Sequence, residues 1–78
     1  MTEEQKNLAR MVLGYFGAAG GYEPGGFTAL ILRACQKADP ANKHRLSLGF
    51  PEHVAMMDAC VNTESGVADL QKALGVTV

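Results

Sequence analysis

Residues 22–57 read YEPGGFTALILRACQKADPANKHRLSLGFPEHVAMM, a helical apolar pattern that Gly and Pro divide into short pieces. A glycine-rich loop comes first, and apolar or basic segments then follow one another across residues 39–40 and 49–51. Proline opens a helix readily but interrupts one that is under way, and glycine commonly ends a helix. The stretch therefore predicts several short helices joined by tight turns.

The same pattern extends to both ends of the chain. Thr2 with Gln5 three residues later is typical of a capping box at a helix start, and Gly75 is suited to end a helix. No segment alternates convincingly with the period of two that a strand requires. We expect an all-α fold, a compact bundle of four to five short helices in a single domain over residues 1–78. The expected helices comprise residues 2–18, 27–38, 40–48, 51–61 and 64–74.

Two details of these helices are open to a structural test. Gly14 and Gly17 in the first helix predict either a close backbone crossing or early fraying, since each costs about 1 kcal/mol relative to Ala. Gly49 is expected to be a left-handed residue after the third helix, with Phe50 making the hydrophobic contact that follows such a cap.

The second helix is expected to be the central one, because most of its surface is apolar. One face is predicted to lie against the core, and Ala29, Leu32 and Cys35 lie beside that face. The residues of the predicted core face are Phe27, Leu30, Ile31, Ala34 and Ala38.

Composition narrows the classes of function. The chain has 78 residues, 47% hydrophobic and 19% charged, with a formal net charge of −1. A dedicated nucleic-acid binder usually carries a basic surplus, and a chain this short has little interior for so much apolar surface. Some apolar surface is therefore expected to contact a partner or a second copy. The acidic start at residues 2–5 and the lack of an apolar run of about 20 residues predict a cytoplasmic protein with reduced thiols and no membrane span.

Metal binding and catalysis are not expected. Cys35, His44, His53 and Cys60 are separated by nine, nine and seven positions, whereas zinc ligands usually come in pairs two to four residues apart. Neither cysteine has the electropositive, partly exposed surroundings that activate a thiol. We expect no metal, no cofactor and no enzymatic activity.

One local excess of positive charge is present. Helices at residues 27–38 and 40–48, with a short connection, could imitate a helix-turn-helix, so a small DNA-binding regulator is the alternative function. A solvated face is favoured because the net charge is −1 and the second of these helices has barely two turns. The candidate basic patch comprises Arg33, Lys37, Lys43, His44 and Arg45.

Met56 and Met57 are the candidate partner interface. Methionine is flexible and common on adaptable binding surfaces, although in small cores it more often fills gaps. The two side chains point about 100° apart on an ideal helix, so at most one lies deep in the core.

The turn segments YEPGGF at residues 22–27, ADPAN at 38–42 and LGFPE at 48–52 carry a resemblance to a group of known proteins. They resemble small helical proteins of unknown function encoded by actinobacteria and their bacteriophages, over about the middle half of the chain. The resemblance implies a short non-structural protein that binds host components, and it implies no catalytic or ligand residues. We therefore expect a protein-binding module that docks on a host protein, with homo-oligomers as a corollary.

Overall fold

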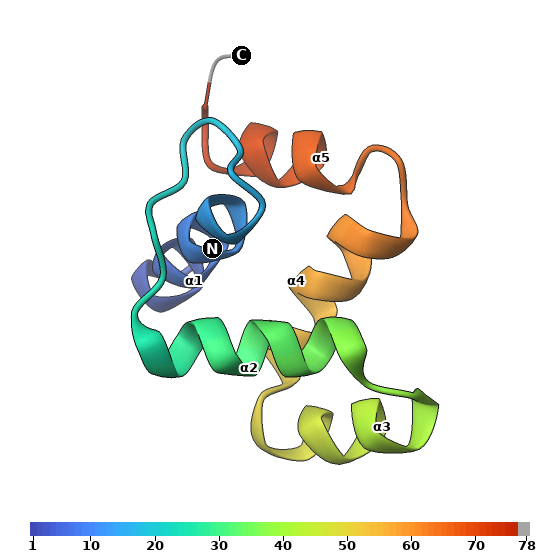
Figure 1. Ribbon diagram of the computed structural model, residues 1–78. Coiled ribbons are helices and arrows are strands. Elements are labelled where there is room, and N and C mark those ends of the chain that lie inside the picture. Colours follow the sequence, from blue (N-terminus) through green and yellow to red (C-terminus); the bar gives the residue numbers. More distant parts are fainter. Residues whose placement is uncertain (77–78) are drawn as a thin grey trace.

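The computed structural model describes residues 1–76 and consists, over that range, of five helices and no strand. The all-α class is confirmed, and Figure 1 shows the helices crossing one another around a small interior. Nowhere in residues 1–76 is a helix long and apolar enough to cross a membrane. The helices are α1 (Glu3–Tyr15), α2 (Gly26–Lys37), α3 (Pro40–Gly49), α4 (Pro51–Asn62) and α5 (Gly66–Ala73).

Helix starts follow the local signals of the sequence. The Gln5 backbone N–H donates to Thr2 Oγ1 at 3.1 Å and the Thr2 N–H donates to Gln5 Oε1 at 2.8 Å, which completes the capping box. Asp39 caps α3 by accepting from the Asn42 N–H at 2.8 Å, and Pro40 occupies the first helical position. These interactions span three residues, so they form wherever the sequence places the right side chains.

The two glycines of the first helix have separate roles. A Cβ at Gly14 would lie 1.8 Å from the Tyr22 carbonyl oxygen, so the loop after α1 crosses this helix in backbone contact. Gly17 has φ +69°, and the N–H groups of Gly17 and Ala18 donate to the Gly14 and Leu13 carbonyls at 3.0 and 2.9 Å. This is a Schellman motif, so α1 ends at Tyr15 and not near residue 18.

The prediction for Gly49 is wrong. Positive φ among the described residues occurs at Gly17, Gly20 and Gly75, whereas Gly49 is the last residue of α3. The chain turns instead at Phe50, which has φ −134° and ψ 58° and serves as the end of α3 and the start of α4. Pro51 lacks an N–H and favours a helix start, so one non-helical residue is enough to separate the two helices.

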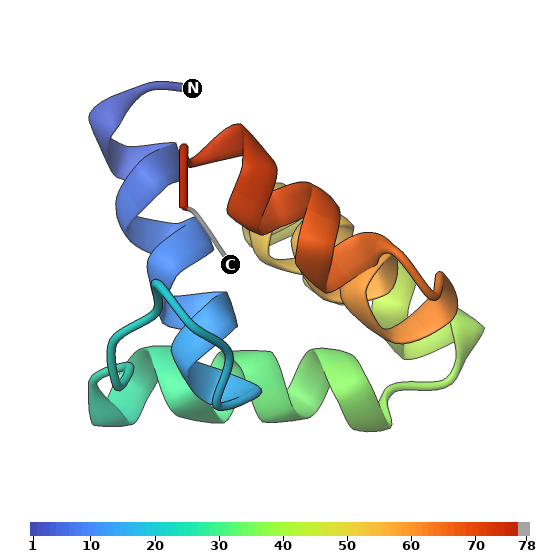
Figure 2. The same cartoon turned by 90° about the horizontal axis from the view of Figure 1, so that it is seen from above.

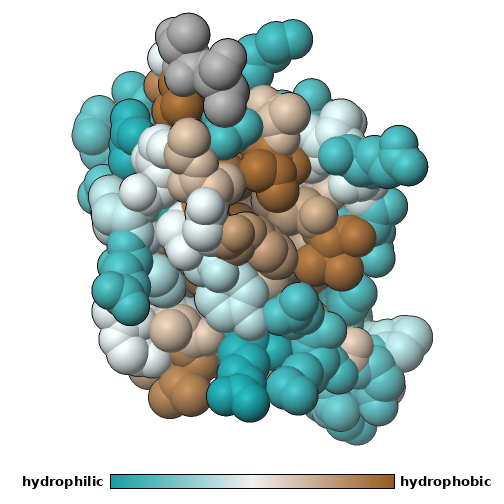
Figure 3. Space-filling view, turned by 45° about the horizontal axis from the view of Figure 1, so that its top comes forward, coloured by the Kyte–Doolittle hydropathy of each residue, from teal (hydrophilic) through white to brown (hydrophobic). Residues whose placement is uncertain are grey.

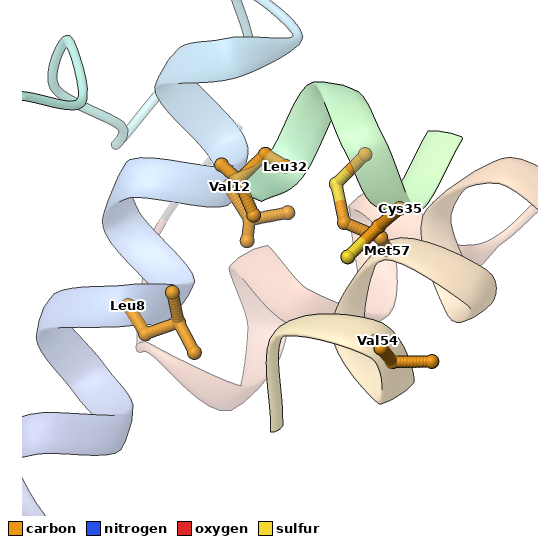
Figure 4. Packing of buried hydrophobic residues seen from close by; sticks show 6 residues of the cluster. All are labelled: Leu8, Val12, Leu32, Cys35, Val54 and Met57. Atoms are coloured by element: carbon orange, nitrogen blue, oxygen red, sulfur yellow. The ribbon is translucent and has the colours of Figure 1, made fainter. Parts of the chain in front are cut away.

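The core lies between α1, α2 and α4, as Figure 4 shows. Its buried cluster comprises Leu8, Val12, Leu32, Cys35, Val54 and Met57. The central element is α4, which packs against α1, α2, α3 and α5, so the expectation of a central second helix is wrong. In Figure 2, α5 lies alongside α4, and α2 crosses beneath α1.

The loop between α1 and α2 is tied to the bundle by polar contacts. The Arg10 guanidinium donates to the Gly20 carbonyl at 2.8 Å, and the Tyr22 hydroxyl lies 3.3 Å from the Asn7 carbonyl oxygen. The buried Gln71 amide of α5 donates to the Ala19 carbonyl at 2.9 Å. The loop therefore holds α1 and α5 together.

Candidate functional site

A groove of about 540 Å³ separates α2 from α3. The two helices run in opposite directions (Figure 1), and both pack on α4. Its apolar part comes from α2 and from the end of α3, and its cations are Lys37 and Arg45. The lining residues are Ala34, Lys37, Ala38, Asn42, Arg45, Leu46, Gly49 and Phe50.

Three features hold α3 away from α2. The connection between the two helices, Ala38-Asp39, is extended at both residues. The Lys43 ammonium contacts the Asp58 carboxylate of α4 at 2.8 Å. Leu46 packs against the core cluster. Because α3 is attached to α4 in this way, it covers only part of the apolar face of α2.

The predicted core face of α2 is corrected by this arrangement. Phe27 and Leu30 are 68% and 65% exposed, whereas Leu32 and Cys35 are buried. The helix meets α1 and α4 on the side of Leu32 and Cys35. The Phe27 ring lies 6.1 Å from the ring of Phe50, so the exposed apolar residues of α2 continue directly into the groove.

These exposed side chains are the functional candidates that the sequence pattern did not identify. A helix that is apolar on two faces is normally buried on both. That signal is present in residues 27–38, where two apolar faces adjoin. The pattern alone predicts that both faces are buried, because it does not show how many helices cover the element.

The expected basic patch is divided in the structure. Lys37 and Arg45 line the groove, and the Arg45 guanidinium donates to Asn42 Oδ1 at 2.9 Å. Lys43 faces α4, where Asp58 compensates its charge. Arg33 and His44 are exposed outside the groove lining. Two of the five residues of the expected patch therefore lie on the same surface.

The methionine pair is also divided. Met57 is 1% exposed and belongs to the core cluster, so it is the methionine of the pair that lies deep in the core and its side chain has no surface to offer a partner. Met56 is partly buried against the same cluster. Neither residue lines the α2–α3 groove.

The cysteines and histidines do not converge. Within residues 1–76 no group of three or more Cys, His, Asp or Glu side chains could hold a metal ion. Burial raises the pKa of the Cys35 thiol, and the Asp58 carboxylate raises it further. Burial also raises the pKa of Cys60, so both thiols stay protonated and weakly nucleophilic at neutral pH.

A second, smaller hollow of about 250 Å³ lies on the other side of Phe50, between the start of α1 and the start of α4. Its lining includes Glu4, Glu52 and His53. Burial lowers the pKa of His53, and the neighbouring Glu52 carboxylate opposes that shift. The His53 ring meets Phe50 edge-on, with centroids 5.2 Å apart, so this hollow is partly filled by its own side chains.

Apolar side chains also reach the surface elsewhere. Figure 3 shows a face on which hydrophobic side chains gather between hydrophilic ones. Such exposure is ordinary for a small protein, and a single apolar side chain at the surface is weak support for a binding site. The α2–α3 groove differs from these scattered residues because its apolar side chains line a hollow together with two cations, Lys37 and Arg45.

Comparisons of the chain with models of known protein families, with curated protein sequences and with solved structures gave no match. The fold defines a small all-α protein, and the functional assignment depends on the geometry of its surface.

Proposed function

We propose that this chain is a non-catalytic protein-binding module that docks on a partner protein through the α2–α3 groove and the exposed residues beside it. The observation that carries the proposal is the exposure of Phe27 and Leu30 next to a hollow of about 540 Å³. Large exposed apolar side chains release ordered water when a partner covers them, and this is the main driving force of protein association.

The setting of the module is part of the proposal. The resemblance of the turn segments to phage and actinobacterial proteins implies that the chain is phage-encoded and that its partner belongs to a bacterial host. Cys35 and Cys60 are free thiols, which fits a reducing compartment such as the host cytoplasm. A second copy of the chain is the competing occupant of the groove.

The proposal is tested by photo-crosslinking from two exposed apolar positions. A benzophenone amino acid replaces Leu30 beside the groove or, as the matched control, Val61, which is 47% exposed on α4 and lies outside the groove lining. Each protein is irradiated in a nuclease-treated actinobacterial lysate. We expect one protein adduct of defined mass from position 30 and none of that mass from position 61.

Competition makes the readout specific. Excess unlabelled wild-type protein should suppress the adduct from position 30, whereas the Leu30→Glu variant should not, because a carboxylate in the apolar contact is costly to desolvate. Equal adducts from both positions, or none from position 30, would overturn the proposal. An adduct of twice the mass of the chain would replace the heterologous partner by a second copy.

A further inference from the structure

The side of α2 that faces the groove is a continuous apolar stripe. Phe27, Leu30 and Ala34 recur at intervals of three and four residues, the spacing that places side chains on one face of a helix, and Ala38 follows directly after the helix. The adjoining side of α2 contributes Leu32 and Cys35 to the core. A helix with two apolar faces is normally covered on both. In the described chain, α3 covers only one end of the stripe.

The shape of the open space fits a helix. The groove side of α3 is formed by Asn42, Arg45, Leu46 and Gly49, which also recur at intervals of three and four. Two antiparallel helices that both rest on α4 leave a trough into which the ridge of a third helix can pack. At Gly49 nothing lies within 4 Å of where a Cβ would be, so that end of the trough is open to an incoming side chain.

The charges of the groove have one sign. Its lining holds the cations Lys37 and Arg45 and no carboxylate. Among residues 1–76 the ion pairs are Lys6–Glu3 and Lys43–Asp58, so neither groove cation has an acidic partner within the described chain. The nearby Asp39 carboxylate is engaged at the start of α3. The charged residues of the groove lining are therefore both positive, although the net charge of the chain is −1.

We infer that the occupant of the groove is an acidic amphipathic helix of the partner, about three turns long, matching the 12 residues of α2. Its apolar face covers the stripe of Phe27, Leu30 and Ala34, and Asp or Glu residues flanking that face meet Lys37 and Arg45. The inference rests on the proposed function and adds the chemistry of the partner. A nucleic acid is disfavoured because most of the lining is apolar or uncharged.

The inference is tested with a display library of amphipathic helical peptides. Apolar residues are fixed at positions i, i+3, i+4 and i+7, and the flanking positions vary among Glu, Gln and Lys. Peptides selected on the immobilised wild-type protein should be enriched in Glu at the flanking positions. The dissociation constant of a selected peptide is then measured by fluorescence anisotropy.

Charge reversal supplies the decisive comparison. The Lys37→Glu/Arg45→Glu double variant should bind the selected peptide about tenfold more weakly, because two attractive contacts become repulsive. A peptide with Lys in place of the selected Glu residues should prefer the double variant to the wild type. Lys72→Glu on α5, also exposed and outside the groove, is the control and should leave the affinity unchanged. Circular dichroism verifies that each variant is folded.

The outcomes separate this inference from the proposed function. Selected peptides with no preference for Glu, or a double variant whose preference does not reverse, would overturn the acidic helix. If such peptides still required Leu30, judged by loss of binding in Leu30→Glu, protein docking at the groove would stand. A library from which no helix is enriched would overturn the inference, and the crosslinking from position 30 would still decide the proposed function.

Discussion

At the scale of single residues, the effect of a glycine depends on what surrounds it in the fold. Gly14 and Gly49 both lie within one turn of a helix end, and neither has a positive φ. Gly14 is required because the backbone of Tyr22 occupies the place of its Cβ, whereas Gly49 faces open space. The difference comes from the loop that folds back on α1, and local sequence does not encode that contact.

The close crossing at Gly14 predicts a severe effect of a single methyl group. Gly14→Ala should lower the free energy of unfolding by about 3 kcal/mol, because the clash is with backbone that cannot move without displacing the loop. Urea unfolding followed by circular dichroism measures the loss. Gly26→Ala is the matched control, since nothing lies within 4 Å of its Cβ position. Equal stability of the two variants would show that the loop does not cross α1 in this way.

At the scale of elements, the boundary between α3 and α4 depends on one residue. The chain changes direction at Phe50. The Phe50 N–H donates to the Leu46 carbonyl at 2.7 Å, and the Phe50 ring packs near the rings of both Phe27 and His53. Gly49 therefore contributes no special backbone conformation to the turn.

This boundary predicts that Gly49→Ala stabilises the protein. Alanine favours the helical conformation over glycine, and its Cβ meets nothing within 4 Å, so the free energy of unfolding should rise by about 0.5–1 kcal/mol. The midpoint of thermal unfolding should increase accordingly. A decrease would indicate that Gly49 has the left-handed conformation that its position before Phe-Pro suggests. Gly17→Ala, at φ +69°, provides the opposite case and should lower the midpoint.

The orientation of α2 is the other result at this scale. Its sequence is apolar enough to be central, yet α4 has that place. The helix α4 is central because it contacts α1, α2, α3 and α5, whereas α2 packs mainly against α1 and α4. The apolar face of α2 that remains is the basis of the proposed docking surface.

At the scale of the whole molecule, the stability of this small core is expected to depend on pH. Burial lowers the pKa of His53 below the ordinary value of 6.5, and the acidic neighbours in its hollow are Glu4 and Glu52. The unfolded chain therefore takes up a proton more readily than the folded one. Stability is fully present above about pH 6.5 and falls as the pH drops through that value toward the lower folded-state pKa.

Urea unfolding at a series of pH values tests this dependence. The midpoint of the wild type should fall as the pH drops below about 6.5, and His53→Gln should show a smaller fall over the same window. The glutamine variant retains a polar side chain but has no proton to gain. Identical pH profiles for the two proteins would assign the acid sensitivity to other groups.

The sequence by itself determined the all-α class, a bundle of four to five short helices and the approximate position of most helix ends. Thr2 and Asp39 act through hydrogen bonds to residues three positions away, and Pro40 and Pro51 act through their own fixed φ. Their effect is therefore the same wherever the helix lies in the fold. The short basic α3 and the loop before α2 were likewise predictable from turn residues.

Only the tertiary structure decided which apolar faces are buried and which charges share a surface. Met57 is enclosed, Leu30 is open, and Lys43 is compensated by Asp58 because of where α4 crosses the other helices. These outcomes depend on contacts between residues far apart in the chain. Helical periodicity identifies the apolar faces of α2, but packing determines how many neighbouring helices cover them. The groove is open because no helix of the described chain covers the second apolar face of α2 along its whole length.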